Sequence, residues 1–263
     1  MPDISLIISV YNRTDALVLI FAALNEQRLK NFEVVVAEDN DSKEMKAFIN
    51  SEKLKSYFTI KHVSQEDIGF RKNKILNEAI KAAAGNYLVF IDGDCVPHHS
   101  FLEQYHHLLT PKICLFGRRV MLSEKFTQKI LLSQNTGQIS IFNLLFSGSK
   151  RLEEGIYFPF SLNLKHKDGG MWGCNFGVQK QHMLDINGFD EDYISANVGE
   201  DEDVEWRLKK IGVKFKRIKN RAILYHLHHR THYSTEDYTN NFALMQNKIK
   251  AGSFFCKNGI VKS

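Results

Sequence analysis

The stretch RKNKILNEAIKAAAGNYLVFIDGD, residues 71–94, passes from a helix pattern to a buried-strand pattern and ends on two aspartates. Its first part predicts a helix that ends at Gly85, because glycine is common just after the last helical residue. Residues 86–92 predict a strand, since a short apolar run lies between polar residues. Asp92 and Asp94 therefore stand at the end of a buried strand, where acidic side chains need a partner.

Strand and helix patterns also alternate before this segment. Short β-branched runs predict strands, and apolar residues at helical spacing predict the helices between them. In chain order these are a strand over 4–11, a helix over 14–27, a strand over 32–39, a helix over 42–55 and a strand over 57–63. Such alternation with short connections is typical of βαβ units. We therefore expect an α/β fold with a single, Rossmann-like, mostly parallel sheet flanked by helices.

Polar side chains gather where the predicted strands end. In sheets of this class, ligands bind beyond the carboxyl ends of the strands. The polar residues at those ends are Asn12, Arg13, Glu38, Asp39, Asp92 and Asp94. Their common position predicts a ligand site at this edge of the sheet.

The composition is that of a soluble globular chain. Its 263 residues carry a net charge of +5, which suits anionic ligands but is too small to indicate a nucleic-acid partner. Four scattered cysteines form no C-x-x-C pair, so neither a disulfide framework nor a zinc knuckle is expected. There is no basic leader and no apolar run of the ~18 residues that span a bilayer. We expect a cytoplasmic protein; nothing in the sequence indicates an oligomeric state.

The second half of the chain is less regular. Residues 123–170 contain a helix-like stretch followed by loop patterns, and residues 213–228 predict a strand pair. No internal repeat is visible, so we expect one domain over 1–230. A helical tail over 231–263 is interpreted as packing on that domain. A dimer contact and a peripheral contact with the inner face of a membrane stay open for the tail, which carries Phe254 and Phe255 among lysines.

The Asp-Gly-Asp motif has two interpretations. Carboxylates just past a buried strand suit Mg²⁺ or Mn²⁺, which prefer oxygen ligands, and Gly93 leaves room for a ligand. The same residue types also form ordinary turns. Their position at the ligand edge favours the metal, so we expect both carboxylates to serve a metal rather than an arginine. For Asp39 two roles remain open. Its carboxylate can accept a hydrogen bond from a nucleobase imide N–H, or it can stand before the start of the next helix, where acids are electrostatically favoured.

The segment GEDEDVEWRLKKIG, residues 199–212, predicts a helix with four acids in its first turn. Val204 and Leu208 belong to an apolar stripe, and Asp201 lies on the extension of that stripe. Acids that only complement the helix dipole have no fixed direction. Asp201 is instead expected to face the body of the domain, where burial favours a role as a general base.

The segment LYHLHHRTHY, residues 224–233, contains four histidines. If it is a strand, His226 and His228 share one face and His229 points to the other. A histidine nitrogen at a strand end adds to aspartate oxygens the kind of ligand that favours Mn²⁺ over Ca²⁺. Ordinary surface or core histidines are the alternative, and a structural zinc site is not expected without a nearby cysteine.

Taken together, these motifs resemble the inverting family 2 nucleotide-sugar glycosyltransferases of GT-A fold, over roughly residues 3–230. SLIISVYNRTD resembles the opening strand and nucleotide loop, and FEVVVAEDNDS the uracil-contacting strand end, with Glu38 where the family more often has aspartate. GFRKNKILNEAIKAAAGNYLVFIDGD is similar to the family's helix, strand and D-x-D core. WGCNFGVQKQHMLDINGFDE and GEDEDVEWRL resemble the substrate-binding half of chondroitin-polymerase-like and β-1,4-galactosyltransferase-like enzymes.

The resemblance implies a nucleotide-binding half at 1–95 and a sugar- and acceptor-binding half at 96–230. On the nucleotide side it implies that Tyr11 stacks on uracil, that Asp39 bonds the imide and that Arg71 contacts the nucleotide, with Asn12 and Arg13 in the same loop. Trp172 and Gly173 stand where related enzymes line the sugar pocket, although the family pattern varies at Trp172.

For the chemistry, the resemblance implies Mn²⁺ or Mg²⁺ on Asp94, with Asp92 at the ribose or the metal. His226 best matches a later metal ligand, and His228 is the second choice. Glu200 holds sugar or acceptor hydroxyls, and Asp201 is the base. The implied reaction moves a sugar from a UDP-sugar to a hydroxyl of a glycan or lipid-linked acceptor, with inversion.

Three alternatives stay open. Nucleotidyl transfer also uses aspartate-bound metal, but it favours a glycine-rich phosphate loop that SVYNRTD does not offer. A binding module that kept the fold and lost the chemistry is disfavoured by the intact acidic motifs. A retaining mechanism is the third. The sequence does not indicate the donor sugar, the acceptor or the linkage.

Overall fold

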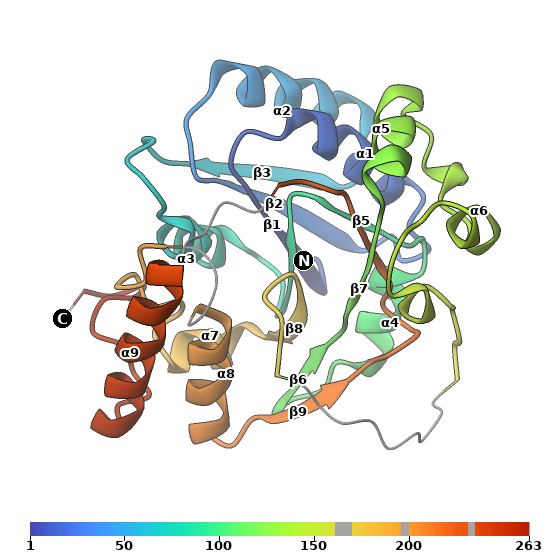
Figure 1. Cartoon of the computed structure of the whole chain (residues 1–263). Helices are drawn as coiled ribbons and strands as arrows, with labels where there is room; N and C mark the ends of the chain where they lie inside the picture. The colour runs from blue at the N-terminus through green and yellow to red at the C-terminus, as the bar shows by residue number, and fades with distance from the viewer. Residues whose placement is uncertain (161–169, 196–199, 231–234, 263) are drawn as a thin grey trace.

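The computed structural model, which describes residues 1–160, 170–195, 200–230 and 235–262, contains a central seven-stranded sheet (Figure 1). Its strand order is β3-β2-β1-β4-β8-β6-β9. The strands are β1 (Ile4–Val10), β2 (Phe32–Glu38), β3 (Thr59–Ser64), β4 (Tyr87–Asp92), β6 (Ile113–Phe116), β8 (Asn175–Gln179) and β9 (Lys214–Arg217). Only β8 runs antiparallel to its neighbours, so the predicted mostly parallel sheet is confirmed.

The β-branched runs explain why the first strands lie in the middle of the molecule. Nearly every residue of β1 and all of β2 are buried, as strands covered on both faces must be. They pair in parallel, and β1 pairs in parallel with β4 on its other side. Because β8, β6 and β9 extend the same sheet beyond β4, both expected halves of the domain share one sheet.

Helices cover both faces of the sheet, and the sheet separates two cores (Figure 1). One core receives apolar side chains from α1 (Thr14–Asn25), α2 (Lys43–Lys55) and α4 (Phe101–Leu108). The other receives them from α3 (Lys72–Ala82), α7 (Lys180–Asp185) and α8 (Glu200–Lys210). Val204 and Leu208 of α8 are fully buried there, as the apolar stripe predicts.

A second, three-stranded sheet orders the region that follows β4. It consists of β5 (Cys95–Pro97), β10 (Leu224–His226) and β7 (Arg119–Met121), with β10 in the middle. The prediction of a strand pair over 213–228 is therefore wrong: β9 pairs with β6 and β10 with β5 and β7. Beyond β10, the Leu227 amide donates to the Asp94 carbonyl oxygen at 2.9 Å, which joins the histidine segment to the Asp-Gly-Asp turn.

The remaining elements lie around this frame. The helix-like stretch after residue 123 forms α5 (Glu124–Ser133), followed by a 3₁₀ turn (Thr136–Gln138), α6 (Ile141–Leu145) and a second 3₁₀ turn (Leu152–Glu154). The tail forms α9 (Thr235–Ala251), whose Lys248 binds Asp190 and Asp192 at 2.6 Å each, so the tail packs on the domain. Among the described helices, none has the length and apolar character needed to cross a membrane.

Candidate active site

The Asp-Gly-Asp motif forms the turn between β4 and β5. Asp92 is the last residue of β4, and Gly93 and Asp94 make the turn. The Gly93 amide donates to the Ser9 carbonyl oxygen at 2.7 Å. A Cβ on Gly93 would lie 2.9 Å from that oxygen and 2.8 Å from the Val10 Cβ, so the close approach of β1 requires glycine here.

Asp94 lies against two imidazoles. Its Oδ2 is 3.3 Å from Nε2 of His226 and 3.1 Å from Nε2 of His229. Burial alone would raise the pKa of Asp94, but the two imidazoles beside it hold that pKa well below its usual range. Asp94 is therefore a carboxylate at neutral pH.

This Asp-His-His cluster fits a divalent metal ion. One ligand atom from each residue lies within 4.8 Å of the other two. His226 is 4% exposed, and within the described residues its Nδ1 has no hydrogen-bond partner, which is a costly state for a buried polar group. A carboxylate oxygen with two imidazole nitrogens is a donor set that suits Mn²⁺.

The structure corrects the expected pairing of His226 with His228. Strand β10 ends at His226, so the alternation of a strand does not continue to the next two histidines. The chain instead turns, the His228 amide donates to Thr127 Oγ1 at 2.9 Å, and the His228 side chain is exposed. His229 joins His226 at Asp94, while the fourth histidine, His232, lies outside the described residues.

Asp92, unlike Asp94, lies beside the cationic side chains of a lysine and an arginine. Its carboxylate lies 3.2 Å from Lys72 Nζ and 3.5 Å from Arg119 Nη1, and it accepts a hydrogen bond from Ser9 Oγ at 3.1 Å. The expectation that neither aspartate serves an arginine is therefore corrected for Asp92, while its role at a metal stays a prediction. Since Asp92 partly offsets two positive charges, it positions them at the end of β1 and β4.

The predicted nucleotide residues meet around the end of β2. Asp39 accepts from the Arg71 amide at 2.8 Å and from Gln65 Nε2 at 2.6 Å. Tyr11 is 48% exposed, and its hydroxyl donates to Asp67 at 2.7 Å. The 65–71 segment thus links Tyr11, Asp39 and Arg71.

Two further predicted nucleotide residues lie at the start of α1. Asn12 is exposed, and Arg13 precedes the first helical residue. The Arg13 guanidinium binds Asp15 at 2.8 Å and 3.0 Å. Pairing with Asp15 raises the pKa of Arg13, and the negative charge of Asp94 adds to that rise.

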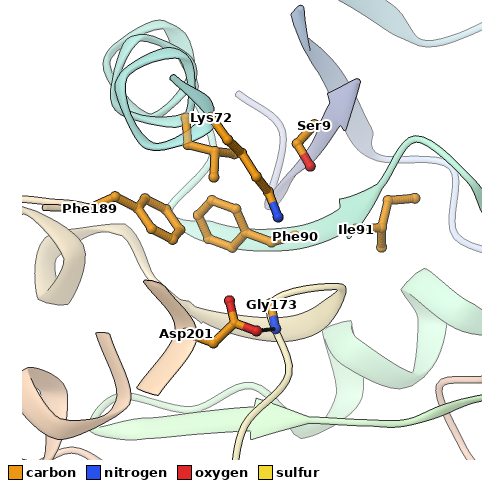
Figure 2. A pocket seen from close by; sticks show the side chains of 8 residues that line it. Ser9, Lys72, Phe90, Ile91, Gly173, Phe189 and Asp201 are labelled. Atoms are coloured by element: carbon orange, nitrogen blue, oxygen red, sulfur yellow. Dashed lines mark hydrogen bonds between the residues drawn. The ribbon is translucent and has the colours of Figure 1, made fainter. Parts of the chain in front are cut away.

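Asp201 and Gly173 meet in a small pocket at the start of α8 (Figure 2). The Gly173 amide donates to Asp201 Oδ2 at 2.6 Å. Figure 2 shows the Asp201 carboxylate and the Lys72 ammonium group pointing into the pocket from opposite sides. The lining residues are Ser9, Lys72, Leu76, Phe90, Ile91, Gly173, Phe189 and Asp201. Glu200 is the first residue of α8, but its side chain lies outside what the structure describes.

The pocket and the cluster are connected through Asp92 and its cations. Lys72 lines the pocket of Asp201 and contacts Asp92, which is two residues from Asp94. Trp172, next to Gly173, lies under the guanidinium groups of Arg118, Arg151 and Arg119, at 4.5, 4.6 and 5.9 Å from the ring centroid. The structure therefore brings the acidic motifs and the Trp-Gly motif to one region.

Residues 5–183 match the family described as glycosyl transferase family 2, and residues 160–230 match the family described as the N-terminal domain of galactosyltransferase. The first match covers more than half of the chain. The chain therefore belongs to glycosyl transferase family 2.

Curated proteins with similar sequences act on sugars. A chondroitin synthase of Escherichia coli is 26% identical over 242 residues, which span 86% of this chain and 35% of that protein. The amylovoran biosynthesis glycosyltransferase AmsB of Erwinia amylovora is 25% identical over 235 residues, which span 86% of this chain and 71% of that protein. The chain thus spans about a third of the length of the chondroitin synthase.

Solved structures share the fold over nearly the whole chain. TarS of S. aureus aligns with a TM-score of 0.62 at 17% identity, covering 95% of this chain and 40% of that one. The mannosyltransferase PcManGT of Pyrobaculum calidifontis, solved with GDP-Man and Mn²⁺, aligns with a TM-score of 0.64 at 15% identity, covering 95% and 64%. This likeness defines a GT-A fold, and the predictions of family, fold and enzyme class are confirmed.

Proposed function

We propose that the chain moves a sugar from a UDP-sugar to a hydroxyl group of a glycan or lipid-linked acceptor, with inversion at the anomeric carbon. The observation that carries this proposal is the connection of the Asp94, His226 and His229 cluster to the pocket of Asp201 through Asp92 and Lys72. One end of this site offers ligands for a metal with its diphosphate, and the other offers a carboxylate for a proton.

The residues that would hold the metal are Asp94, His226 and His229. Bound there, Mn²⁺ or Mg²⁺ acts as a Lewis acid that stabilises negative charge on a diphosphate leaving group. Lys72 and Arg119 add two fixed positive charges beside Asp92, close to where that charge develops. Asp92, in contact with both cations, keeps them in place and is also within reach of a ribose.

On the acceptor side, Asp201 takes the proton of the attacking hydroxyl group. The acceptor oxygen forms its bond to the anomeric carbon while the bond from that carbon to the diphosphate oxygen breaks. The bonding electron pair leaves with UDP, and attack from the opposite face inverts the configuration. The hydrogen bond from the Gly173 amide to one oxygen of Asp201 holds this carboxylate at the pocket. Glu200 holds sugar or acceptor hydroxyls.

On the donor side, Tyr11 stacks on uracil, and Asn12, Arg13 and Arg71 surround the nucleotide. Both oxygens of Asp39 already accept a hydrogen bond, from Gln65 and from the Arg71 amide. Each carboxylate oxygen has a second lone pair, so Asp39 can still accept from the uracil imide. A UDP-sugar donor is supported by TarS, whose structure has been determined with UDP and with UDP-GlcNAc. Galactose, N-acetylgalactosamine, glucose and N-acetylglucosamine donors all fit this proposal.

A peripheral contact of the tail with a membrane surface also stays a proposal. Phe254 and Phe255, which follow α9, are each 42% exposed. Exposed aromatic side chains near Lys257 suit a headgroup region.

A screen of nucleotide sugars with Mn²⁺, scored by release of the nucleoside diphosphate, tests the proposed function. We expect slow, metal-dependent hydrolysis of one UDP-sugar even without an acceptor, since water can take the place of the acceptor hydroxyl. Chelation with EDTA should abolish UDP release, and added Mn²⁺ should restore it. Release that is unaffected by chelation, or a consistent preference for a non-uridine nucleotide, would contradict the proposal.

Replacing Gly173 with alanine tests the positioning of Asp201. The added Cβ would lie 2.1 Å from Asp201 Oδ1, so the carboxylate must move. We expect kcat to fall by about 10²-fold, the typical effect of an ångström-scale misplacement of a catalytic group. Gly137→Ala, in an exposed turn, is the control for the loss of a glycine. Initial rates of UDP release at saturating donor measure the effect, and a Gly173→Ala enzyme with unchanged kcat would contradict the assignment.

A further inference from the structure

The arginines around Trp172 come from two different parts of the chain. Arg118 and Arg119 stand at the start of β7, and Arg151 follows the antiparallel bridge between Met121 and Lys150. The Arg118 and Arg151 guanidinium groups both lie within 4.6 Å of the ring centroid. The aromatic ring thus holds two guanidinium groups close together, with Arg119 slightly farther away.

Two of the described acids near this cluster have other partners. Glu154 binds Arg217, and Asp92 is shared by Lys72 and Arg119. Arg118 is buried and donates to the carbonyl oxygens of Gly117 and Gly170. Burial lowers the pKa of Arg118, and the positive charges of Arg217 and Arg151 lower it further.

Arg151 is the accessible member of the cluster. Its side chain is exposed, and among the residues that the structure describes it has no carboxylate partner. Its backbone is in the left-handed region at φ 57°, where a non-glycine residue is uncommon. The fold therefore places an unneutralised guanidinium group beside Trp172.

The position of the cluster indicates which substrate it faces. Trp172 precedes Gly173, whose amide binds Asp201, so the cluster adjoins the pocket of the proposed base. Arg151 comes from the segment after α6, whereas the proposed nucleotide residues stand at the ends of β1 and β2 and at the start of α3. An anion held by Arg151 therefore lies on the acceptor side of the site.

We propose that Arg151, stacked on Trp172 beside Arg118, binds a negatively charged group of an acidic acceptor, either a uronate carboxylate or a phosphodiester. The proposal rests on the proposed function, since it assigns the acceptor class of the same site. A guanidinium group matches both anions through paired N–H donors.

Calorimetry on the full chain loaded with Mn²⁺ and UDP tests this without turnover. The probes are a hexasaccharide that contains uronic acid, the same hexasaccharide with its carboxyl groups reduced, and a glycerol phosphate oligomer. We expect an acidic probe to bind at least about tenfold more tightly than the reduced one, the effect of a charge-assisted contact. Arg151→Gln should remove this preference, and Lys150→Gln, which removes the neighbouring exposed charge, should keep it.

The two acidic probes separate the sources of the anion: preference for the hexasaccharide assigns a carboxylate, and preference for the oligomer a phosphodiester. Equal binding of the acidic and reduced probes would overturn the proposal, as would an Arg151→Gln variant that behaves like Lys150→Gln. A loss of UDP affinity in Arg151→Gln equal to its loss for the acidic probe would assign the anion to the donor diphosphate instead. If no nucleotide sugar releases UDP, the proposed function fails while the binding result stands by itself.

Discussion

Replacing Asp94 with alanine is expected to lower kcat/KM for sugar transfer by roughly 10³-fold, because a bound metal supplies several kcal/mol of charge stabilisation in the transition state. Asp94 is the acidic member of the cluster with His226 and His229, so its removal leaves the two imidazoles without the carboxylate ligand. Affinity for Mn²⁺ should fall together with activity. Calorimetry with Mn²⁺ and UDP, and the rate of UDP release, measure the two losses.

His228 offers a matched control for this prediction. Its side chain is exposed and lies outside the cluster, so His228→Ala should change activity by no more than about twofold. His229→Ala should weaken Mn²⁺ binding. Unchanged Mn²⁺ affinity in Asp94→Ala, or an equal loss in His228→Ala and His229→Ala, would contradict the assignment of the metal ligands.

Replacing Asp201 with asparagine should lower kcat by about 10³-fold, within the usual range for loss of a general base. The asparagine side chain keeps an oxygen that can accept from the Gly173 amide, so the pocket should keep its shape. Affinity for UDP and Mn²⁺ should stay near that of the unmodified chain. Rates at saturating donor and acceptor, with UDP affinity from calorimetry, separate the loss of chemistry from a loss of binding.

Glu202→Gln is the control on the same helix. Glu202 is exposed in the first turn of α8, so this variant removes an acid from the same helix start. Glu202→Gln should keep most of the activity if Asp201 acts as a base. Equal losses of kcat in Glu202→Gln and Asp201→Asn would instead indicate that both acids act through the helix dipole. An Asp201→Asn enzyme with full kcat would remove Asp201 from the mechanism.

The order of the elements was predictable because local patterns dominate the first half of the chain. The strand patterns at 4–11 and 32–39 became β1 and β2 with boundaries shifted by a single residue. Burial on both faces selects β-branched residues there, and no long-range contact is needed to recognise them. The short strands β9 and β10 were paired wrongly, since the partner of a three- or four-residue strand depends on which edges the rest of the fold leaves open.

The candidate site was predictable where its residues lie at the end of a strand or the start of a helix. Asp94 and Asp201 follow such signals, and both lie at the region where the acidic motifs meet. Lys72 was missed although it directly follows Arg71, because nothing in a helix start reveals that its side chain reaches Asp92. His229 was missed because the strand rule of alternating faces fails once β10 ends.

The arginines around Trp172 carried no sequence signal. Arg118 and Arg151 are 33 positions apart, and the segment between them has no pattern that predicts its path. Their approach to Trp172 depends on β7, on its bridge to Lys150 and on the hydrogen bond from Arg118 to the Gly170 carbonyl oxygen. Such contacts arise from tertiary structure, so no local sequence pattern predicts them.

The proposed reaction is a single displacement in which an acceptor hydroxyl group takes the sugar from a UDP-sugar at this site. The most direct test is a proton NMR time course of the reaction with the donor identified by the UDP-release screen, because it shows the first-formed product and its anomeric configuration together. The proposed mechanism predicts transfer with inversion, so a donor with an α-linked diphosphate gives a β-linked product. A first-formed α-linked product would contradict the single displacement and the role of Asp201 as its base.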